Sequence, residues 1–342
     1  MSSAFTPVAV VGDRLCSELL DVTADLTALD SSGFWAVVVP YDGEPVCARF
    51  GTIRPAVPWT GAPWKGLPLD SWSSSLDRAG FEAGVSEIRS SIANGDVYQV
   101  NLTRRLRARL THPDQQRIEA LGAALAVGNP APFSAVVSIP SHDVAVASAS
   151  PELFLARDGE LLRSSPIKGT AATPDGFLAK DRAENVMIVD LVRNDLGMVC
   201  EWGSVKVPSL LTTEAHPGLY HLVSTVEGRL RPGNGWAEAI AATFPPGSVT
   251  GAPKISACSI IERLEPESRG VYCGGVGWVD ADNRRGELNV AIRTFWISDG
   301  ELNFGTGGAI TWDSDPTGEW DETELKARRL LAVASGSFAG LR

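Results

Sequence analysis

The chain has 342 residues, of which 44% are hydrophobic and 21% charged, a balance typical of a globular protein with a sizeable core. Lys and Arg total 30 and Asp and Glu total 41, and the resulting net charge of −11 disfavours general binding of nucleic acids. No apolar run approaches the roughly 20 residues of a membrane span. The first 13 residues hold no Lys or Arg, so we expect no signal peptide.

Hydrophobic periodicity predicts the elements in chain order. Short strands come first, at residues 7–11 and 34–40, before a stretch at residues 54–75 that is rich in Pro, Gly and Ser. The further predicted strands cover residues 97–102, 134–139, 144–147, 153–156, 221–226, 275–279, 288–297 and 302–304. The predicted helices cover residues 81–92, 177–196, 236–244, 253–264 and 319–333. Because strands cluster instead of alternating with helices, we predict an α+β fold with antiparallel sheets.

The cysteines and histidines argue against disulfides and zinc. The 5 cysteines are odd in number and form no C-x-x-C motif, and the 4 histidines have no metal-ligand spacing. We therefore expect a cytoplasmic protein. Any bound metal would be held by carboxylates, which favours magnesium over zinc.

Two predicted helices carry pairs of acids on stripes that continue into apolar residues. Asp181 and Glu184 form one pair, and Glu319 and Glu322 form the other. Acids at positions i and i+3 repel each other unless a cation lies near them, and magnesium suits such a set. The alternative is two solvated helix starts, where acids favour the helix dipole. Periodicity alone leaves both open.

Three further stretches point to a small anion. Residues 248–253 lead into a predicted helix whose free N–H groups could face an anion. Residues 304–309 read as a Gly-rich turn at the end of a strand, where a backbone can approach a ligand closely. Arg293 falls in a predicted strand, and alternation points it inward. Together they predict a polyanion held by backbone amides, a few cations and a metal.

Several longer motifs resemble, in order, those of the chorismate-utilising enzymes. This family includes anthranilate synthase component I, aminodeoxychorismate synthase component I and the isochorismate and salicylate synthases. The matching segments are residues 95–102 (GDVYQVNL), 150–154 (SPELF), 166–170 (PIKGT), 184–197 (ENVMIVDLVRNDLG), 221–224 (HLVS), 247–254 (GSVTGAPK), 291–294 (AIRT) and 305–326. The resemblance implies two antiparallel sheets packed face to face, with helices outside. It implies a chorismate-binding catalytic domain at residues 79–340, to which residues 1–78 add strands.

The resemblance implies a role for each matched residue. Magnesium would be held directly by Glu184 and Glu322, and through water by Asp181 and Glu319. The implied general acid for the C4 hydroxyl of chorismate is Glu152, because hydroxide is a poor leaving group. The implied neighbours of the substrate are His221 at the leaving hydroxyl, Thr250 and Gly251 at the ring carboxylate, Tyr272, Arg293, Gly307 and Gly308 at the enolpyruvyl carboxylate, and Lys326 beside the acids.

Two positions distinguish branches of the family. The isochorismate and salicylate synthases carry a Lys where this chain has Gln99, and Gln cannot take a proton from water. Anthranilate synthases typically carry Ala at the position of Lys168, whereas the aminodeoxychorismate synthases carry Lys there, as this chain does. A neutral lysine amine can attack C2 as the C4 hydroxyl leaves, and ammonia can then add at C4 and expel the lysine. Lys168 could instead be a simple carboxylate-binding cation.

These residues predict that chorismate is aminated to 4-amino-4-deoxychorismate. No cysteine lies in a nucleophile elbow, so the resemblance implies that a separate glutamine amidotransferase subunit supplies ammonia. An anthranilate synthase component I is the first alternative, and a non-catalytic chorismate-binding subunit is the second.

Overall fold

The computed structural model describes residues 6–171, 173–216 and 219–337. The strands are β1 (Val8–Val11), β2 (Arg14–Thr23), β3 (Phe34–Val39), β4 (Val46–Pro55), β5 (Ser73–Ser74), β6 (Gln99–Arg109), β7 (Phe133–Ile139), β8 (Val144–Ser150), β9 (Leu153–Asp158), β10 (Leu161–Ser165), β11 (Ile167–Ala171), β12 (Lys206–His216), β13 (Leu219–Arg229), β14 (Gly251–Ala252), β15 (Gly275–Asp280), β16 (Arg285–Val290), β17 (Thr294–Ser298) and β18 (Glu301–Ile310). The α-helices are α1 (Arg78–Ala93), α2 (Ile118–Gly128), α3 (Ala179–Val199), α4 (Trp236–Thr243), α5 (Lys254–Leu264) and α6 (Pro316–Ala334).

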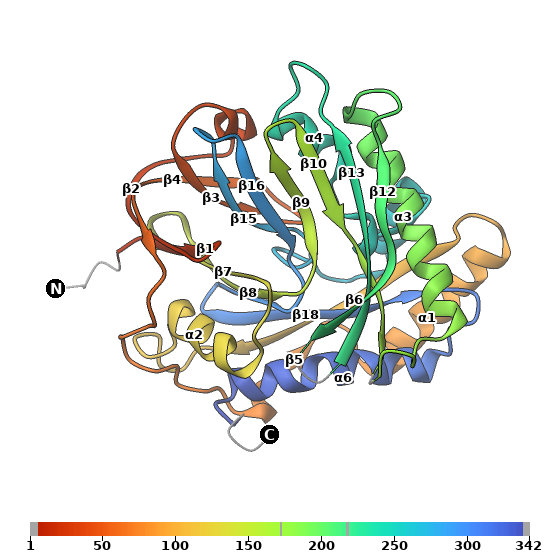
Figure 1. Ribbon diagram of the computed structural model, residues 1–342. Helices are drawn as coiled ribbons and strands as arrows, with labels where there is room; N and C mark the ends of the chain where they lie inside the picture. The colour runs from red at the N-terminus through yellow and green to blue at the C-terminus, as the bar shows by residue number, and fades with distance from the viewer. Residues whose placement is uncertain (1–5, 172, 217–218, 338–342) are drawn as a thin grey trace.

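All strand pairs are antiparallel and join into one continuous network (Figure 1). One half runs in the order β12, β13, β10, β9, β16, β15, β3 and β4. Strands β2 and β1 connect it to the other half, β7, β8, β17, β18 and β6. Strand β11 also pairs with β13, and β5 and β14 pair with β6.

The two halves of the network share the largest apolar core. Val37 and Val276 from the first half and Val137 and Val146 from the second all belong to it. Side chains of a strand alternate between its faces, so the next residue after Val146 turns the other way. Ala147 belongs to a second core, into which residues of α2 and α6 also pack. The result is the α+β arrangement expected from the sequence, with helices covering the outer faces (Figure 1).

Helices α3 and α4 lie against the first half of the network and α1, α2 and α6 against the second (Figure 1). The N-terminal strands belong to the same network, since β1 pairs with β7 and β3 with β15. None of the helices in the described part of the chain has the length and apolar character needed to cross a membrane.

The structure corrects two predictions of local structure. The strand predicted at residues 288–297 is broken, because β16 ends at Val290 and β17 begins at Thr294. Arg293 lies in this break with a φ of 51°, so strand alternation does not direct its side chain. Residues 304–309 are not a turn but part of β18, which pairs with β6 along this stretch.

Candidate active site

Lys168 lies on β11 and reaches across to the segment before α5. Its Nζ donates a hydrogen bond to the backbone oxygen of Ser248 at 3.1 Å. The next residue, Gly169, has a φ of 81° at an irregularity in the pairing of β11 with β13. A Cβ at Gly169 would lie 2.9 Å from Cβ of Asp181, so this glycine lets the start of α3 approach β11.

The charge of Lys168 depends on opposing effects. Burial lowers its pKa, because the charged ammonium loses water on entering the protein. The carboxylates of Glu184, Glu152 and Glu322 oppose this shift by favouring the ammonium. The net direction is downward, which increases the fraction of neutral, nucleophilic amine.

Glu152 lies between β8 and β9 and is only 4% exposed. Its backbone is held by Ser150 Oγ, which accepts from the Glu152 N–H at 3.2 Å, and by the Val290 N–H, which donates to the Glu152 carbonyl at 3.0 Å. Burial raises the pKa of Glu152 to about 7, against the effects of a hydrogen bond with the Ser248 side chain and of the Lys168 and Arg293 charges. A carboxyl group with such a pKa can hold a proton near neutral pH and donate it.

Ser248 therefore connects the two groups: its backbone oxygen accepts from Lys168, and its side chain interacts with Glu152. The same backbone oxygen accepts from Asn101 Nδ2 at 3.2 Å. Asn101 Oδ1 in turn accepts from Gln99 Nε2 at 3.2 Å, and Gln99 is fully buried. Ser248 and Asn101 had no role in the sequence prediction, although both stand within the motifs that were singled out.

The four predicted metal ligands lie near the starts of α3 and α6. The two helix starts are close enough for their acids to interact electrostatically. Burial raises the pKa of Glu184, and the charges of Asp181 and Glu322 contribute in the same direction. Burial also raises the pKa of Glu319, whose Oε1 accepts from Ser314 Oγ at 2.6 Å. The acids on the two helices thus face a common region.

These acids have protein partners in this structure. Asp181 Oδ2 accepts from the Leu178 N–H at 2.7 Å, and Glu322 pairs with Lys326 at 2.7 Å. Glu322 is about half exposed, so the acids line an open region and not an apolar interior. Across the described residues, no three Asp, Glu, His or Cys side chains lie close enough together to form a ready metal site.

The predicted contacts to the ring of a substrate lie close to Lys168 in the fold. His221 is buried on β13, with its Nδ1 3.4 Å from the Gly169 carbonyl. Thr250 is also buried, and its hydroxyl donates to the Pro246 carbonyl at 3.1 Å. Gly251 pairs with Val100 at a φ of 152°, and a Cβ there would lie 2.2 Å from the Gln99 carbonyl oxygen.

The glycines of β18 face the acids of α6. Lys326 Nζ donates to the Gly307 carbonyl at 3.0 Å, and a Cβ at Gly308 would lie 3.1 Å from Glu319 Oε2. Strand β17 pairs with β18 only as far as Phe304. The other edge of Gly307 and Gly308 is therefore not paired with a strand in the described part of the chain.

The remaining two predicted substrate contacts are Tyr272 and Arg293. Tyr272 is buried, and its ring occupies the space beside Gly305, where a Cβ would lie 2.1 Å from the ring. Arg293 is partly buried, and burial lowers its pKa while the charge of Glu152 opposes this shift. Arg293 thus faces Glu152 even though it is not on a strand.

The match to known families covers this whole arrangement. The model of the chorismate binding enzyme family matches residues 63–332, which include every residue of the candidate site. The chain belongs to this family. Its candidate site therefore lies wholly within the part of the chain that matches the family.

Relatives within the family carry different names. The chain is 35% identical over 317 residues to aminodeoxychorismate synthase component 1 of Salmonella typhimurium, covering 87% of this chain and 68% of that protein. It is 41% identical over 274 residues to an anthranilate synthase component 1 of Haloarcula marismortui, covering 76% of this chain and 54% of that protein. The chain thus spans about half to two thirds of the length of these two relatives.

Solved structures show the same fold. Anthranilate synthase component I from Streptococcus pneumoniae superimposes with a TM-score of 0.76 at 25% identity, covering 95% of this chain and 90% of that one. A putative isochorismate synthase, DhbC, from Bacillus anthracis superimposes with a TM-score of 0.78 at 22% identity, covering 96% of each chain. These neighbours agree with the predicted fold of two packed antiparallel sheets.

Proposed function

We propose that the chain aminates chorismate to 4-amino-4-deoxychorismate, with ammonia supplied by a separate glutamine amidotransferase subunit. The observation that carries this proposal is that Lys168 and Glu152 both interact with Ser248. It places an amine of lowered pKa beside a carboxyl group of raised pKa. The names of the Salmonella typhimurium and Escherichia coli relatives, both aminodeoxychorismate synthase component 1, support the same activity.

In this reaction the neutral amine of Lys168 attacks C2 of chorismate. Both ring double bonds shift by one position, and the C4–O bond breaks. Glu152 donates its proton to the departing hydroxyl, which leaves as water. Ammonia then forms a bond to C4, both double bonds shift back, and the bond between C2 and Lys168 breaks. Lys168 is released as an amine, so it acts as a covalent catalyst.

The carboxylates of α3 and α6 supply the oxygen ligands that magnesium prefers. We propose that Glu184 and Glu322 hold the ion directly and that Asp181 and Glu319 hold it through water. When bound, magnesium would neutralise the ring carboxylate of the substrate and favour loss of the hydroxyl. Glu322 would exchange its Lys326 partner for the ion, because their pair is half exposed and weakly held.

The other polar groups would position the substrate. Thr250 and Gly251 lie on the segment that also contains Ser248, so they can meet the ring carboxylate while Lys168 attacks. Arg293 lies on the Glu152 side, where it can hold the second carboxylate together with Tyr272 and the open edge of Gly307 and Gly308. His221, beside the Gly169 carbonyl, can meet the leaving hydroxyl.

Anthranilate synthase is the second candidate, because the Haloarcula marismortui relative with that name is 41% identical to this chain. Product identity distinguishes the two. The purified chain is incubated with chorismate, magnesium and an ammonium salt, and a lyase that releases 4-aminobenzoate is then added. We expect 4-aminobenzoate by mass spectrometry. Fluorescent anthranilate as the main product would refute the proposal and support the second candidate.

A further inference from the structure

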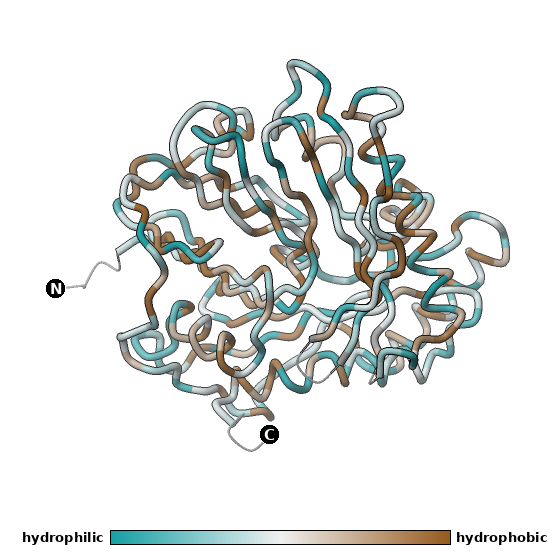
Figure 2. The backbone as a smooth tube through the Cα atoms, in the orientation of Figure 1, coloured by the Kyte–Doolittle hydropathy of each residue, from teal (hydrophilic) through white to brown (hydrophobic). Residues whose placement is uncertain are grey.

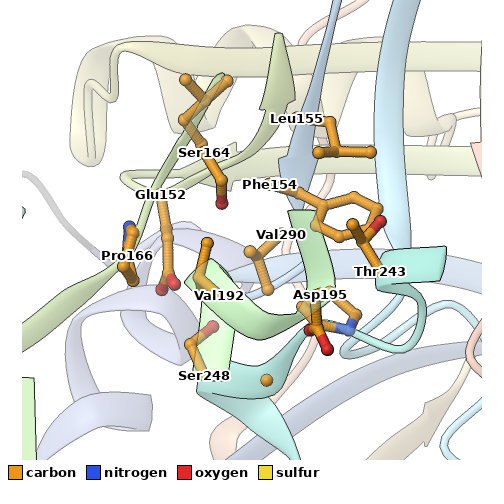
Figure 3. Close-up of a pocket in the computed structure, with 13 residues that line it drawn as sticks. Glu152, Phe154, Leu155, Ser164, Pro166, Val192, Asp195, Thr243, Ser248 and Val290 are labelled. Atoms are coloured by element: carbon orange, nitrogen blue, oxygen red, sulfur yellow. The ribbon is translucent and has the colours of Figure 1, made fainter. Parts of the chain in front are cut away.

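A small pocket lies behind Glu152, on the side formed by α3, α4 and the segment before α5 (Figure 3). Its free volume of about 20 Å³ is enough for one molecule the size of water. The polar residues that line it are Glu152, Ser164, Asp195, Thr243 and Ser248, and most of the remaining wall is apolar. In Figure 3, Glu152 and Ser248 lie on one side of the pocket and Asp195 and Thr243 on the other.

The polar groups of this pocket are mainly acceptors. Glu152 Oε1 is buried and has no hydrogen-bond partner among the described residues. Asp195 is 4% exposed, and Lys254 is its partner, at 2.7 Å. The Thr243 hydroxyl donates to the Ala239 carbonyl at 2.7 Å, so only its oxygen lone pairs remain available. Two carboxyl groups and this oxygen thus share one small space. Lys254 pairs with Asp195, and the charges of Lys168 and Arg293 act on Glu152 from the substrate side.

Such a space calls for a small ligand that is rich in hydrogen-bond donors and positively charged. Water offers two O–H donors and no charge, whereas ammonium offers four N–H donors and a full positive charge in nearly the same volume. Burial raises the pKa of Asp195 to about 6, and a cation in the pocket would stabilise its ionised form.

The position of the pocket agrees with the chemistry of the neighbouring site. Ser248 lines the pocket and interacts with Glu152, while its backbone oxygen accepts from Lys168. One residue thus separates the pocket from the amine of Lys168. Glu152, the proposed acid of the reaction, also lines the pocket, so a molecule bound there lies beside a group that takes part in the chemistry.

We propose that this pocket binds ammonium, the nitrogen donor of the reaction, between Glu152 and Asp195. The inference rests on the proposed amination. Once Glu152 has given its proton to the departing hydroxyl, it is a carboxylate. One N–H bond of ammonium breaks, its electron pair stays on nitrogen, and the proton passes to Glu152. The resulting ammonia attacks C4, and Glu152 is protonated again for the next turnover.

Closing the pocket without touching either carboxyl group tests this proposal. Ser164 lies on β10 and lines the pocket, whereas the next residue, Ser165, does not. Val suits a strand, so Ser164→Val fills the space with two methyl groups while Ser165→Val serves as the matched control. We expect Ser164→Val to raise the KM for ammonium about tenfold or more and to leave the Kd for chorismate unchanged. Ser165→Val leaves both constants unchanged.

A second readout does not depend on turnover. Thallous ion matches ammonium in size and charge and scatters X-rays anomalously. Crystals of the unmodified chain soaked in a thallous salt should show an anomalous peak between Glu152 and Asp195, and crystals of Ser164→Val should not. Should Ser164→Val fail to fold, Thr243→Val replaces it, with the same expected rise in KM.

An unchanged KM for ammonium in a folded pocket variant would overturn the inference, as would a pocket that holds only water and no thallous ion. A chain that makes no aminated product, yet binds thallous ion in the pocket, would refute the proposed function and leave the cation site standing. The two failures are therefore distinguishable.

Discussion

Lys168 and Ser248 are 80 positions apart in the chain, yet Lys168 Nζ lies 3.1 Å from the Ser248 carbonyl oxygen. The hydrogen bond joins β11 to the segment before α5. It directs the amine toward the region that Glu152 also faces. The candidate site depends on this contact, because it brings the proposed nucleophile and the proposed acid together.

Replacing Lys168 by Ala should abolish formation of 4-amino-4-deoxychorismate, since no other amine would attack C2 from this position. Chorismate should still bind, so its Kd should change less than about tenfold, as for the loss of one charged contact. Mass spectrometry of the intact wild-type protein mixed with chorismate but no ammonium should reveal the covalent adduct. Lys206→Ala, an exposed lysine on β12, is the control. Unchanged product and rate in Lys168→Ala would refute the nucleophile role.

Glu152 should determine the alkaline side of the pH profile. A general acid works only while protonated, so kcat should fall as the pH rises through about 7, the pKa to which burial raises Glu152. Glu152→Gln should lower kcat by about 10²–10⁴-fold and remove this fall from the residual rate. A residual activity that still declines near pH 7 would assign the titration to another group.

The same carboxyl group should make the fold less stable at high pH. Its folded pKa of about 7 exceeds the usual 4.5, so the folded chain binds a proton that the unfolded chain has lost. Stability is therefore lost as the pH rises from about 4.5 to about 7. At pH 8, Glu152→Gln should be more stable than the wild type by up to ~3 kcal/mol, and near pH 5 the difference should be small. Urea unfolding of both proteins at both pH values measures this difference in the free energy of unfolding.

The buried pair of Arg269 and Glu265 should be important for both stability and substrate binding. Arg269 Nη2 lies 2.7 Å from Glu265 Oε1, and Arg269 also donates to the carbonyls of Val249 and Asn101. Arg269→Met should cost about 3–5 kcal/mol, because the buried charge of Glu265 would lose its cationic partner. It should also raise the KM for chorismate.

An exposed pair provides the control for this experiment. Arg263 and Glu87 are 2.9 Å apart but about half exposed, so Arg263→Met should cost less than about 1 kcal/mol. Adding Glu265→Gln to Arg269→Met should recover part of the lost stability, since it removes the unpaired charge. Equal losses at the two sites would contradict this account.

Glu184 should determine the affinity for magnesium. Glu184→Gln should raise the magnesium concentration needed for half-maximal activity about tenfold or more, and calorimetry should show weaker binding of the ion. Asp190→Asn is the matched control, because Asp190 lies on the same helix but is exposed and pairs with Arg193. Removing magnesium with a chelator should stop turnover by the wild type. Equal magnesium affinity in both variants would exclude Glu184 as a ligand.

The spacing of apolar residues correctly predicted those helices in which the repeat is strong. The helix expected at residues 81–92 lies within α1 (Arg78–Ala93), and the helix expected at residues 319–333 lies within α6. The repeat of apolar residues is local, so it can be read without knowing the fold. The motifs identified the family for the same reason, since each motif is a short continuous segment.

What the tertiary structure decided was how distant segments meet. The break that removes Arg293 from a strand, and the pairing that keeps Gly307 in β18, depend on neighbouring strands that are remote in sequence. The contact of Ser248 with both Lys168 and Glu152 likewise requires three separate segments to converge. Hydrogen bonds between such segments, and the burial that shifts their pKa values, arise only when the sheets pack, so no local pattern encodes them.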